Sequence, residues 1–189
     1  GEVVGSGGAV FDNVTVEEIT DAEIAAFDRI YNGVDWGFYP DPWAFNRMHY
    51  DAARRTLYIF GELTRHRTGN AETAKLLRQY GVQDTDLITA DSAEPKSIDR
   101  LYALGLAHIR RARKGKDSIN NGIDFIQDYK IFIHPRCTNF LTEIGNYTWD
   151  TDTKTGKKLN RPIDDFNHLM DAMRYALEEY STGPNYSFK

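Results

Sequence analysis

Three aspartates stand at positions from which their carboxylates could act together. Asp35 and Asp91 each end a short apolar run directly before a turn, and Asp171 lies in an amphipathic segment near the end of the chain. Ligands collect where the strands of open α/β sheets end, because the loops there are free to diverge. Carboxylate oxygens are hard ligands that suit Mg²⁺ or Mn²⁺. Three carboxylates brought together there could hold two such ions about 4 Å apart, an arrangement that supports cleavage of phosphodiester bonds.

A histidine accompanies the third aspartate. On a helix, Asp164, His168 and Asp171 fall at positions i, i+4 and i+7 and share one face, which could hold a metal. His168 could ligate or position the second ion. Such a helix would pack by an apolar stripe on roughly the opposite face. The stripe consists of Phe166, Leu169, Ala172, Met173, Ala176 and Leu177. The sequence therefore predicts a helix that begins at about residue 163, carries acids in its first turn and runs to about Tyr180.

Each of these residues also has a purely structural interpretation. Aspartates at strand ends are common turn formers. An outward acidic face is usually only solvated, and Asp164, which follows Pro162 closely, could be an N-cap. A single histidine such as His168 is more often exposed to solvent or satisfied in a core. The combination favours chemistry, because the three acids Asp35, Asp91 and Asp171 come in this order, each in its own element.

Basic residues gather in two segments, although the formal net charge of the chain is −5. The first segment contains Arg110, Arg111, Arg113, Lys114 and Lys116, and the second contains Lys157 and Lys158. Local patches of this kind on an acidic domain are compatible with phosphate binding. They would supply DNA affinity that is independent of sequence and falls steeply with salt. The alternative is that both segments are simply solvated charge.

Several other chemistries are disfavoured. The segment around Gly156 is not a Walker A motif, because residue 151 is Thr instead of Gly and residue 158 is Lys instead of Ser or Thr. The single cysteine, Cys137, excludes an internal disulfide framework and fits a reducing compartment. Its nearest histidine in sequence, His134, precedes a proline, which gives little support for a nucleophilic thiol. No run of about 18 apolar residues occurs, so no membrane-spanning helix is predicted.

The elements that would position these side chains follow from periodicity and turn residues. Strands are predicted at 31–37, 44–50 and 56–63, joined tightly enough to form an antiparallel meander. Helices and strands then alternate. The helices are predicted at 70–80, 97–104, 118–129 and 137–147, and the strands at 87–91, 106–109 and 131–133. The residues on either side of 151–156 resemble the two strands of an exposed hairpin, with 151–156 at its tip. A meander followed by this alternation indicates a mixed sheet with helices packed against it.

The chain of 189 residues fits one globular domain, because its 41% of hydrophobic and 13% of aromatic residues argue against disorder. The predicted domain covers residues 31–180. Residues 1–30 are predicted to be a linker or a short strand, and residues 181–189 a flexible tail. Because the sequence begins at Gly1 without an initiator methionine, we expect a piece of a larger protein.

Three motifs in this order resemble a known family. They are Gly33-Val34-Asp35-Trp36-Gly37, residues 89–97 (Thr-Ala-Asp-Ser-Ala-Glu-Pro-Lys-Ser) and residues 164–175 (Asp-Asp-Phe-Asn-His-Leu-Met-Asp-Ala-Met-Arg-Tyr). From about Gly33 to Tyr180 the sequence resembles the nuclease domain of the large terminase subunit of tailed bacteriophages. The resemblance implies an α/β fold of the ribonuclease H-like type, with a central mixed sheet of five to six strands, an antiparallel meander plus parallel strands, flanked by helices. It also implies an extra β-hairpin at 148–161 that borders a DNA groove.

The resemblance further implies which residues form the site. Asp35, Asp91 and Asp171 would bind two divalent cations, Mg²⁺ or Mn²⁺, with His168 beside the second. Whether Asp164 or Asp165 takes part stays open, because both fit the motif. Residues 1–30 would be the end of a preceding ATPase domain and its linker.

A member of this family is expected to be a metal-dependent endonuclease that cuts concatemeric double-stranded viral DNA during genome packaging. The expected partners are double-stranded DNA and, in the full-length protein, an ATPase domain, a small terminase subunit and a portal. The expected location is the cytoplasm of the infected bacterial host. Two alternatives remain at this point. One is another ribonuclease H-like nuclease, such as a Holliday-junction resolvase or a transposase core, and the other is a non-catalytic module that binds DNA or the portal.

Overall fold

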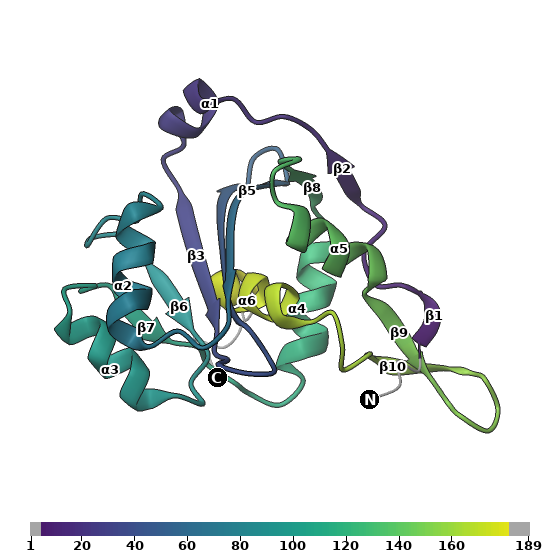
Figure 1. The fold of residues 1–189 in the computed structure, drawn as a ribbon. Coiled ribbons are helices and arrows are strands. Elements are labelled where there is room, and N and C mark those ends of the chain that lie inside the picture. Colours follow the sequence, from purple (N-terminus) through teal and green to yellow (C-terminus); the bar gives the residue numbers. More distant parts are fainter. Residues whose placement is uncertain (1–4, 182–189) are drawn as a thin grey trace, which may run out of the picture.

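A mixed sheet of seven strands forms the centre of the molecule (Figure 1). The computed structural model describes residues 5–181. The strands of this sheet are β2 (Val14–Val16), β3 (Ile30–Asp35), β4 (Trp43–Asp51), β5 (Thr56–Arg65), β6 (Ile88–Ala90), β7 (Ile109–Arg111) and β8 (Lys130–Ile133). Their spatial order is β2-β8-β5-β4-β3-β6-β7. The expected mixed sheet is therefore confirmed, with one strand more than the sequence predicted.

The strand directions follow the predicted pattern. β3, β4 and β5 form an antiparallel meander. β6 then pairs in parallel with β3, β7 with β6, and β8 with β5. The additional strand is β2, which pairs in parallel with β8. It lies within residues 1–30, which the sequence predicts to be a linker or a short strand.

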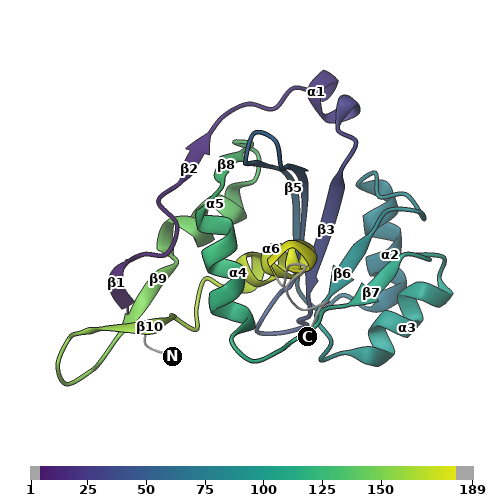
Figure 2. The same ribbon diagram turned by 180° about the vertical axis from the view of Figure 1, so that it is seen from behind.

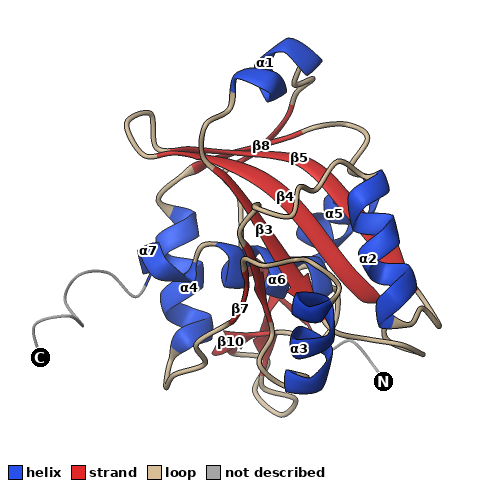
Figure 3. Cartoon of the chain, turned by 90° about the vertical axis from the view of Figure 1, so that its left-hand side faces the viewer, coloured by secondary structure: helices blue, strands red, loops and turns tan. Residues whose placement is uncertain are grey.

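Helices cover both faces of the sheet (Figure 3). They are α1 (Asp21–Ala26), α2 (Asn70–Gln79), α3 (Pro95–Ala103), α4 (Ser118–Gln127), α5 (Thr138–Asn146), α6 (His168–Ala176) and α7 (Glu178–Ser181). On one face, α2 and α3 pack through Leu77 and Leu101 against Phe45 of β4. On the other face, α4, α5 and α6 bury a second apolar cluster that includes Met48 of the same strand. Because its side chains alternate between two cores, β4 is buried almost throughout.

A second, smaller sheet extends from the domain and is visible at the lower left of Figure 2. It contains β1 (Gly5–Ala9), β9 (Thr148–Thr151) and β10 (Lys158–Pro162), in the order β1-β9-β10. β9 and β10 are antiparallel and form the hairpin that the sequence predicts around residues 151–156. β1 adds to it from the predicted linker. The predicted tail at 181–189 lies outside the described residues except for Ser181, the last residue of α7.

Two boundaries differ from the sequence prediction. The final helix does not begin at residue 163: α6 begins at His168, after a turn in which Phe166 has a φ of 51°. A separate short helix, α7, follows α6. The strand expected at 106–109 is instead β7 at Ile109–Arg111, because residues 105–108 form a turn that leaves the helical conformation at Gly105, with a φ of 106°. Within residues 5–181, no helix is long and apolar enough to span a membrane.

Candidate metal-binding active site

Adjacent parallel strands bring Asp35 and Asp91 to the same edge of the sheet. Val34 lies opposite Ala90 in the pairing of β3 with β6, so the aspartates that follow them are neighbours. The backbone N–H of Asp91 donates to the carbonyl of Val34 at 3.0 Å. The indole N–H of Trp36 donates to the carbonyl of Asp91 at 2.7 Å. These bonds hold the two strand ends together, and both aspartates are largely buried, with exposed fractions of 9% and 8%.

Helix α6 supplies the third acid by packing unusually closely on β3. The approach occurs at Gly33, where an added Cβ atom would lie only 1.8 Å from the carbonyl oxygen of Ala172. Asn46 on β4 also donates from its side-chain amide to the carbonyl of Leu169 at 2.9 Å. A glycine in β3 and an asparagine in β4 therefore seat the helix across the sheet, which places Asp171 beside the strand ends.

The start of α6 is held by a carboxylate from α5. Glu143 accepts hydrogen bonds from the backbone N–H groups of Leu169 at 2.8 Å and Met170 at 3.4 Å. Negative charge at this end of a helix satisfies free N–H groups and is favoured by the helix dipole. Asp164, which could have been the N-cap, instead accepts from the side chain of Asn167 at 3.0 Å. The expectation of an N-cap at Asp164 is wrong, because the N-cap of α6 is Asn167. Glu143 has no local signal in the sequence, because it lies 26 residues before Leu169.

His168 contacts two of the surrounding acids. Its Nδ1 lies 3.2 Å from Oδ2 of Asp35, and its Nε2 lies 3.6 Å from Oδ1 of Asp41. The hydrogen bond with Asp35 raises the pKa of the imidazole. The histidine is therefore directed into the site rather than simply solvated. The prediction that Asp164, His168 and Asp171 share one helical face is wrong for Asp164, which precedes the helix. His168 and Asp171 both lie in α6.

The pKa values of Asp35 and Asp171 are both raised in the site. Burial raises the pKa of Asp35, the hydrogen bond from His168 opposes this, and the charges of Asp171 and Asp91 raise it further. Burial likewise raises the pKa of Asp171, whose nearest compensating charge is Arg174, and the charge of Asp91 adds to the effect. Buried like charges that disfavour one another's ionisation mark a position where a cation would be stabilising.

Cationic side chains of the chain itself lie on two of these acids. The Lys114 ammonium forms an ion pair with Asp91, and Arg174 donates to Asp171 at 2.7 Å. Within residues 5–181, no three His, Cys, Asp or Glu side chains lie close enough to form a preassembled metal cluster. The donor chemistry nevertheless fits a divalent cation, because buried, mutually repelling carboxylates with hard oxygen atoms are what Mg²⁺ and Mn²⁺ require.

The predicted basic residues before Lys114 make contacts within the domain. Arg110 donates to the hydroxyl of Thr89 at 3.0 Å and lies 3.7 Å from Glu179. Arg111 forms an exposed ion pair with Asp99 at 3.8 Å. Arg110 and Arg111 belong to the edge strand β7, at the end of the sheet that carries the acids.

The other basic residues are more exposed. Arg113, Lys116 and Lys157 are exposed on the surface. Lys158 extends over the ring of Trp149 in the hairpin, 5.0 Å from its centroid. Lys114 is thus the predicted DNA-binding residue that the structure brings into contact with the acids.

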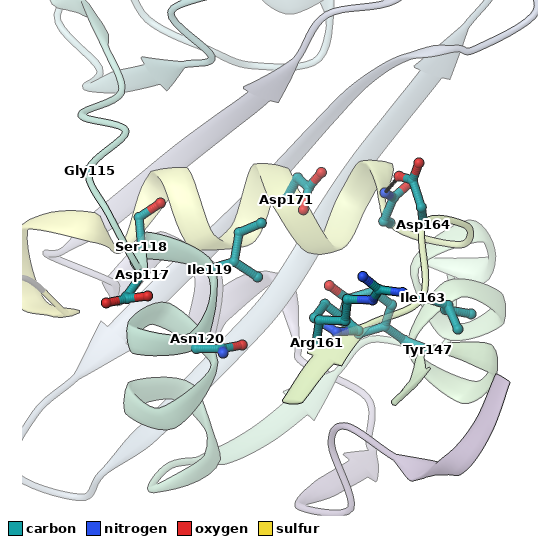
Figure 4. A pocket seen from close by; sticks show the side chains of 12 residues that line it. Gly115, Asp117, Ser118, Ile119, Asn120, Tyr147, Arg161, Ile163, Asp164 and Asp171 are labelled. Atoms are coloured by element: carbon teal, nitrogen blue, oxygen red, sulfur yellow. Dashed lines mark hydrogen bonds between the residues drawn. The ribbon is translucent and has the colours of Figure 1, made fainter. Parts of the chain in front are cut away.

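A cleft of about 500 Å³ opens beside Asp171 (Figure 4). Figure 4 shows Asp171 on α6, with Ser118 and Asn120 of α4 and Arg161 of β10 around the same space. Asp164 also lines this cleft. Asp165 does not, and its side chain accepts from the backbone N–H of Phe166 at 2.8 Å. The sequence does not decide whether Asp164 or Asp165 takes part in the site, and Asp164 is the one that lines the cleft.

A mixed sheet with a meander, with helices on both faces and carboxylates gathered at one edge, defines an α/β domain of the ribonuclease H-like type. A family model described as the terminase RNAseH like domain matches residues 35–179. The chain belongs to this family, which confirms the resemblance seen in the sequence and favours it over resolvases and transposase cores of the same fold.

Two curated relatives support the assignment. The chain is 42% identical over 183 residues to the large terminase subunit of Bacillus phage SPP1, covering 94% of the chain and 43% of the relative. It is 32% identical over 149 residues to the PBSX phage terminase large subunit of Bacillus subtilis (strain 168), covering 78% of the chain and 34% of that relative. The chain therefore spans less than half the length of these relatives.

Solved structures give the same answer for the fold. The g2p (large terminase) nuclease domain from bacteriophage SPP1, solved with bound Mn, matches with a TM-score of 0.84 and 39% identity, covering 90% of this chain and 98% of that one. The P22 large terminase nuclease domain matches with a TM-score of 0.66 and 13% identity, covering 89% and 90% of the two chains. The chain thus corresponds in extent to the nuclease domain of a large terminase subunit.

Proposed function

We propose that this domain is a divalent-metal-dependent endonuclease that cuts concatemeric double-stranded viral DNA during genome packaging. The observation that carries the proposal is the position of three carboxylates from separate elements, which lie near enough for the charges of Asp171 and Asp91 to raise the pKa of Asp35. Asp35 and Asp91 end neighbouring parallel strands, and Asp171 comes from the helix that packs on Gly33. The raised pKa values of Asp35 and Asp171 support a site that favours positive charge.

The residues divide into ligands and positioning groups. Asp35, Asp91 and Asp171 would hold two divalent cations, and His168 would lie beside the second. When bound, the two ions supply the positive charge that activates a water and stabilises the leaving oxygen of the phosphodiester. His168 orients the Asp35 carboxylate through its hydrogen bond, and Glu143 fixes the start of the helix that carries His168 and Asp171. The Mn in the SPP1 nuclease domain supports a divalent ion at this site.

The wider role rests on the relatives. Both curated relatives are large terminase subunits more than twice as long as the matched region. We therefore place this nuclease in a protein with an ATPase domain that acts with a small terminase subunit and a portal, in the cytoplasm of the infected bacterial host. The phosphate-binding residues would come from the basic segments at 110–116 and 157–158, of which Lys114 lies nearest to the acids.

Plasmid cleavage in Mn²⁺ tests the assignment. The Asp35→Ala and Asp91→Ala variants are expected to lose cleavage while keeping the far-ultraviolet circular dichroism of the wild type. Asp128→Ala, at an exposed position just after α4, is the matched control and should cleave normally. Undiminished cleavage by the first two variants would contradict the proposal. Calorimetry with Mn²⁺ separates a nuclease from a non-catalytic module, which should bind no ion at useful affinity.

A further inference from the structure

A third basic stretch lies at the edge of the sheet that carries the acids. It spans residues 65–67 (Arg-His-Arg), begins at the last residue of β5, and is exposed throughout. Asp35 lies opposite Ala44 in the pairing of β3 with β4, and Ala44 lies opposite Thr64 in the pairing of β4 with β5. Asp35 and Thr64 therefore occupy one row across three strands, separated by two strand spacings of roughly 10 Å in total. The basic stretch begins directly after this row.

The acids lie between this stretch and the basic segment at 110–116. The strands β5, β3, β6 and β7 run in the same direction, so all four end at the same edge of the sheet. In the order β5-β4-β3-β6-β7, four strand spacings separate the two outer strands, roughly 20 Å. A groove of DNA is about 6–12 Å wide. Basic side chains at this separation can therefore contact phosphates on both sides of a scissile position.

The loop that follows β3 holds the basic stretch beside the acidic site. The backbone N–H of Arg67 donates to the carbonyl of Phe38 in this loop at 2.7 Å. The same loop carries Asp41, whose Oδ1 lies 3.6 Å from Nε2 of His168. One loop thus contacts the basic stretch at one point and the active-site histidine at another, which fixes the position of the stretch relative to the site.

Exposed aromatic rings accompany the cations of this surface. Phe38 and Tyr39 are 56% and 60% exposed. The guanidinium of Arg67 lies 3.9 Å from the centroid of the Tyr39 ring. His66 packs edge-on against the same ring, and its Nε2 lies 3.0 Å from the carbonyl oxygen of Pro40. Residues 38–39 and 65–67 together form a surface that we call the loop patch, and its combination of rings and cations is typical of proteins that bind nucleic acids.

The arginines of the loop patch are available to an anion. Within residues 5–181, no carboxylate forms an ion pair with Arg65 or Arg67. Arg110 and Arg111, on the other side of the acids, each pair with a carboxylate. Guanidinium groups form strong, often bidentate hydrogen bonds with phosphates. On a chain with a formal net charge of −5, the loop patch concentrates positive charge at the edge of the sheet to which a phosphodiester must come.

We propose that the loop patch binds the sugar-phosphate backbone of the duplex DNA substrate, on the side of Asp35 away from Lys114. Arg65 and Arg67 contact phosphates, and Tyr39 positions the Arg67 guanidinium by stacking. The inference rests on the proposed nuclease function and adds the direction in which the substrate extends beyond the acids. DNA bound in this way is held by cations on both sides of the carboxylates.

Three paired variants isolate the charge of the patch. Arg65→Gln with Arg67→Gln removes two positive charges from it. Arg54→Gln with Arg55→Gln is the matched control, because it removes two charges from the exposed turn between β4 and β5, at the opposite edge of the sheet. Arg65→Lys with Arg67→Lys keeps both charges. All these positions are exposed, so each pair should melt close to the wild-type temperature.

Binding of a short DNA duplex is measured by fluorescence anisotropy in EDTA, where no cleavage occurs. The glutamine pair at Arg65 and Arg67 is expected to bind about tenfold more weakly than the wild type, and its plot of log affinity against log salt should be shallower by about two. The control pair and the lysine pair should keep the wild-type slope, because the phosphate contacts depend on charge.

Two results would overturn the DNA-binding role of the loop patch. One is equal affinity and equal slope for the two glutamine pairs, or no binding by the wild type. The other is a slope in the lysine pair as shallow as in the glutamine pair at the same positions. Wild-type plasmid cleavage in Mn²⁺ is recorded in parallel. Cleavage with equal binding overturns the patch alone, whereas binding weakened only at the patch, without any wild-type cleavage, overturns the nuclease function alone.

Discussion

Gly33 is the position at which the site depends most directly on close packing. A Cβ atom there would lie 1.8 Å from the carbonyl oxygen of Ala172 and 2.6 Å from its carbonyl carbon. Because Cβ contacts essentially never fall below 3.0 Å, Gly33→Ala must separate α6 from β3 by about 1.2 Å, the difference between 3.0 and 1.8 Å. Both atoms belong to the backbone, so no side-chain rotation relieves the clash.

The magnitude of the effect follows from this displacement. Overpacking of a core costs about 1–3 kcal/mol of unfolding free energy, which lowers the Tm of a domain of this size by several degrees. The separation also carries Asp171 away from Asp35 and Asp91, and a misplacement of about 1 Å reduces catalysis about 100-fold. Thermal unfolding measures the first effect, and the rate of plasmid cleavage in Mn²⁺ measures the second.

Gly145→Ala is the matched control, because it makes the same change in α5 where no described atom lies within 4 Å of the added Cβ. It should melt at the wild-type temperature or slightly above, since alanine favours helix more than glycine does. Wild-type melting and wild-type DNA cleavage in Gly33→Ala would show that α6 does not depend on the close approach at Gly33.

Two further predictions concern charged groups around the acids. Burial raises the pKa of Glu143 from 4.5 to about 7, so between these pH values the folded protein holds a proton that the unfolded chain has released. Stability should therefore fall as the pH rises from about 4.5 to 7, with a contribution from Glu143 of up to about 3 kcal/mol. Glu143→Gln, which keeps an acceptor for the α6 N–H groups, should weaken this dependence in urea unfolding curves. Lys114→Ala removes the ammonium from Asp91 and should tighten Mn²⁺ binding by up to about fivefold in calorimetry, with Lys116→Ala as the control.

Either prediction can fail on its own. A pH dependence as steep in Glu143→Gln as in the wild type would contradict the raised pKa of Glu143. Unchanged Mn²⁺ affinity in Lys114→Ala would mean that the lysine does not compete with the ion for the Asp91 carboxylate.

Local sequence patterns predict the sheet and the positions of Asp35 and Asp91 at the ends of two of its strands. The apolar runs that end at Asp35 and Asp91 form strands. The residues that mark each strand and the turn that closes it lie within a few positions of one another, so a local pattern is enough to predict them. The meander follows from the short connections between β3, β4 and β5, and parallel pairing then places both aspartates at one edge. The helix that carries His168 and Asp171 was also expected, because its apolar stripe has helical spacing.

What the sequence could not reveal depends on contacts between distant residues. Glu143 has no local signal, since its role is to accept from N–H groups of another helix. The beginning of α6 was placed too early because Asp164 and Asp165 resemble a capped first turn, while the positive φ of Phe166 delays the helix. The closeness of Gly33 to Ala172 becomes apparent only when the helix lies across the strand.

Crystals of this domain soaked in Mn²⁺ and measured at the manganese absorption edge test whether Asp35, Asp91 and Asp171 together bind divalent cations. We expect anomalous peaks between these three carboxylates, with the Lys114 ammonium displaced from Asp91. Anomalous density elsewhere on the molecule, with Lys114 still paired to Asp91, would contradict it.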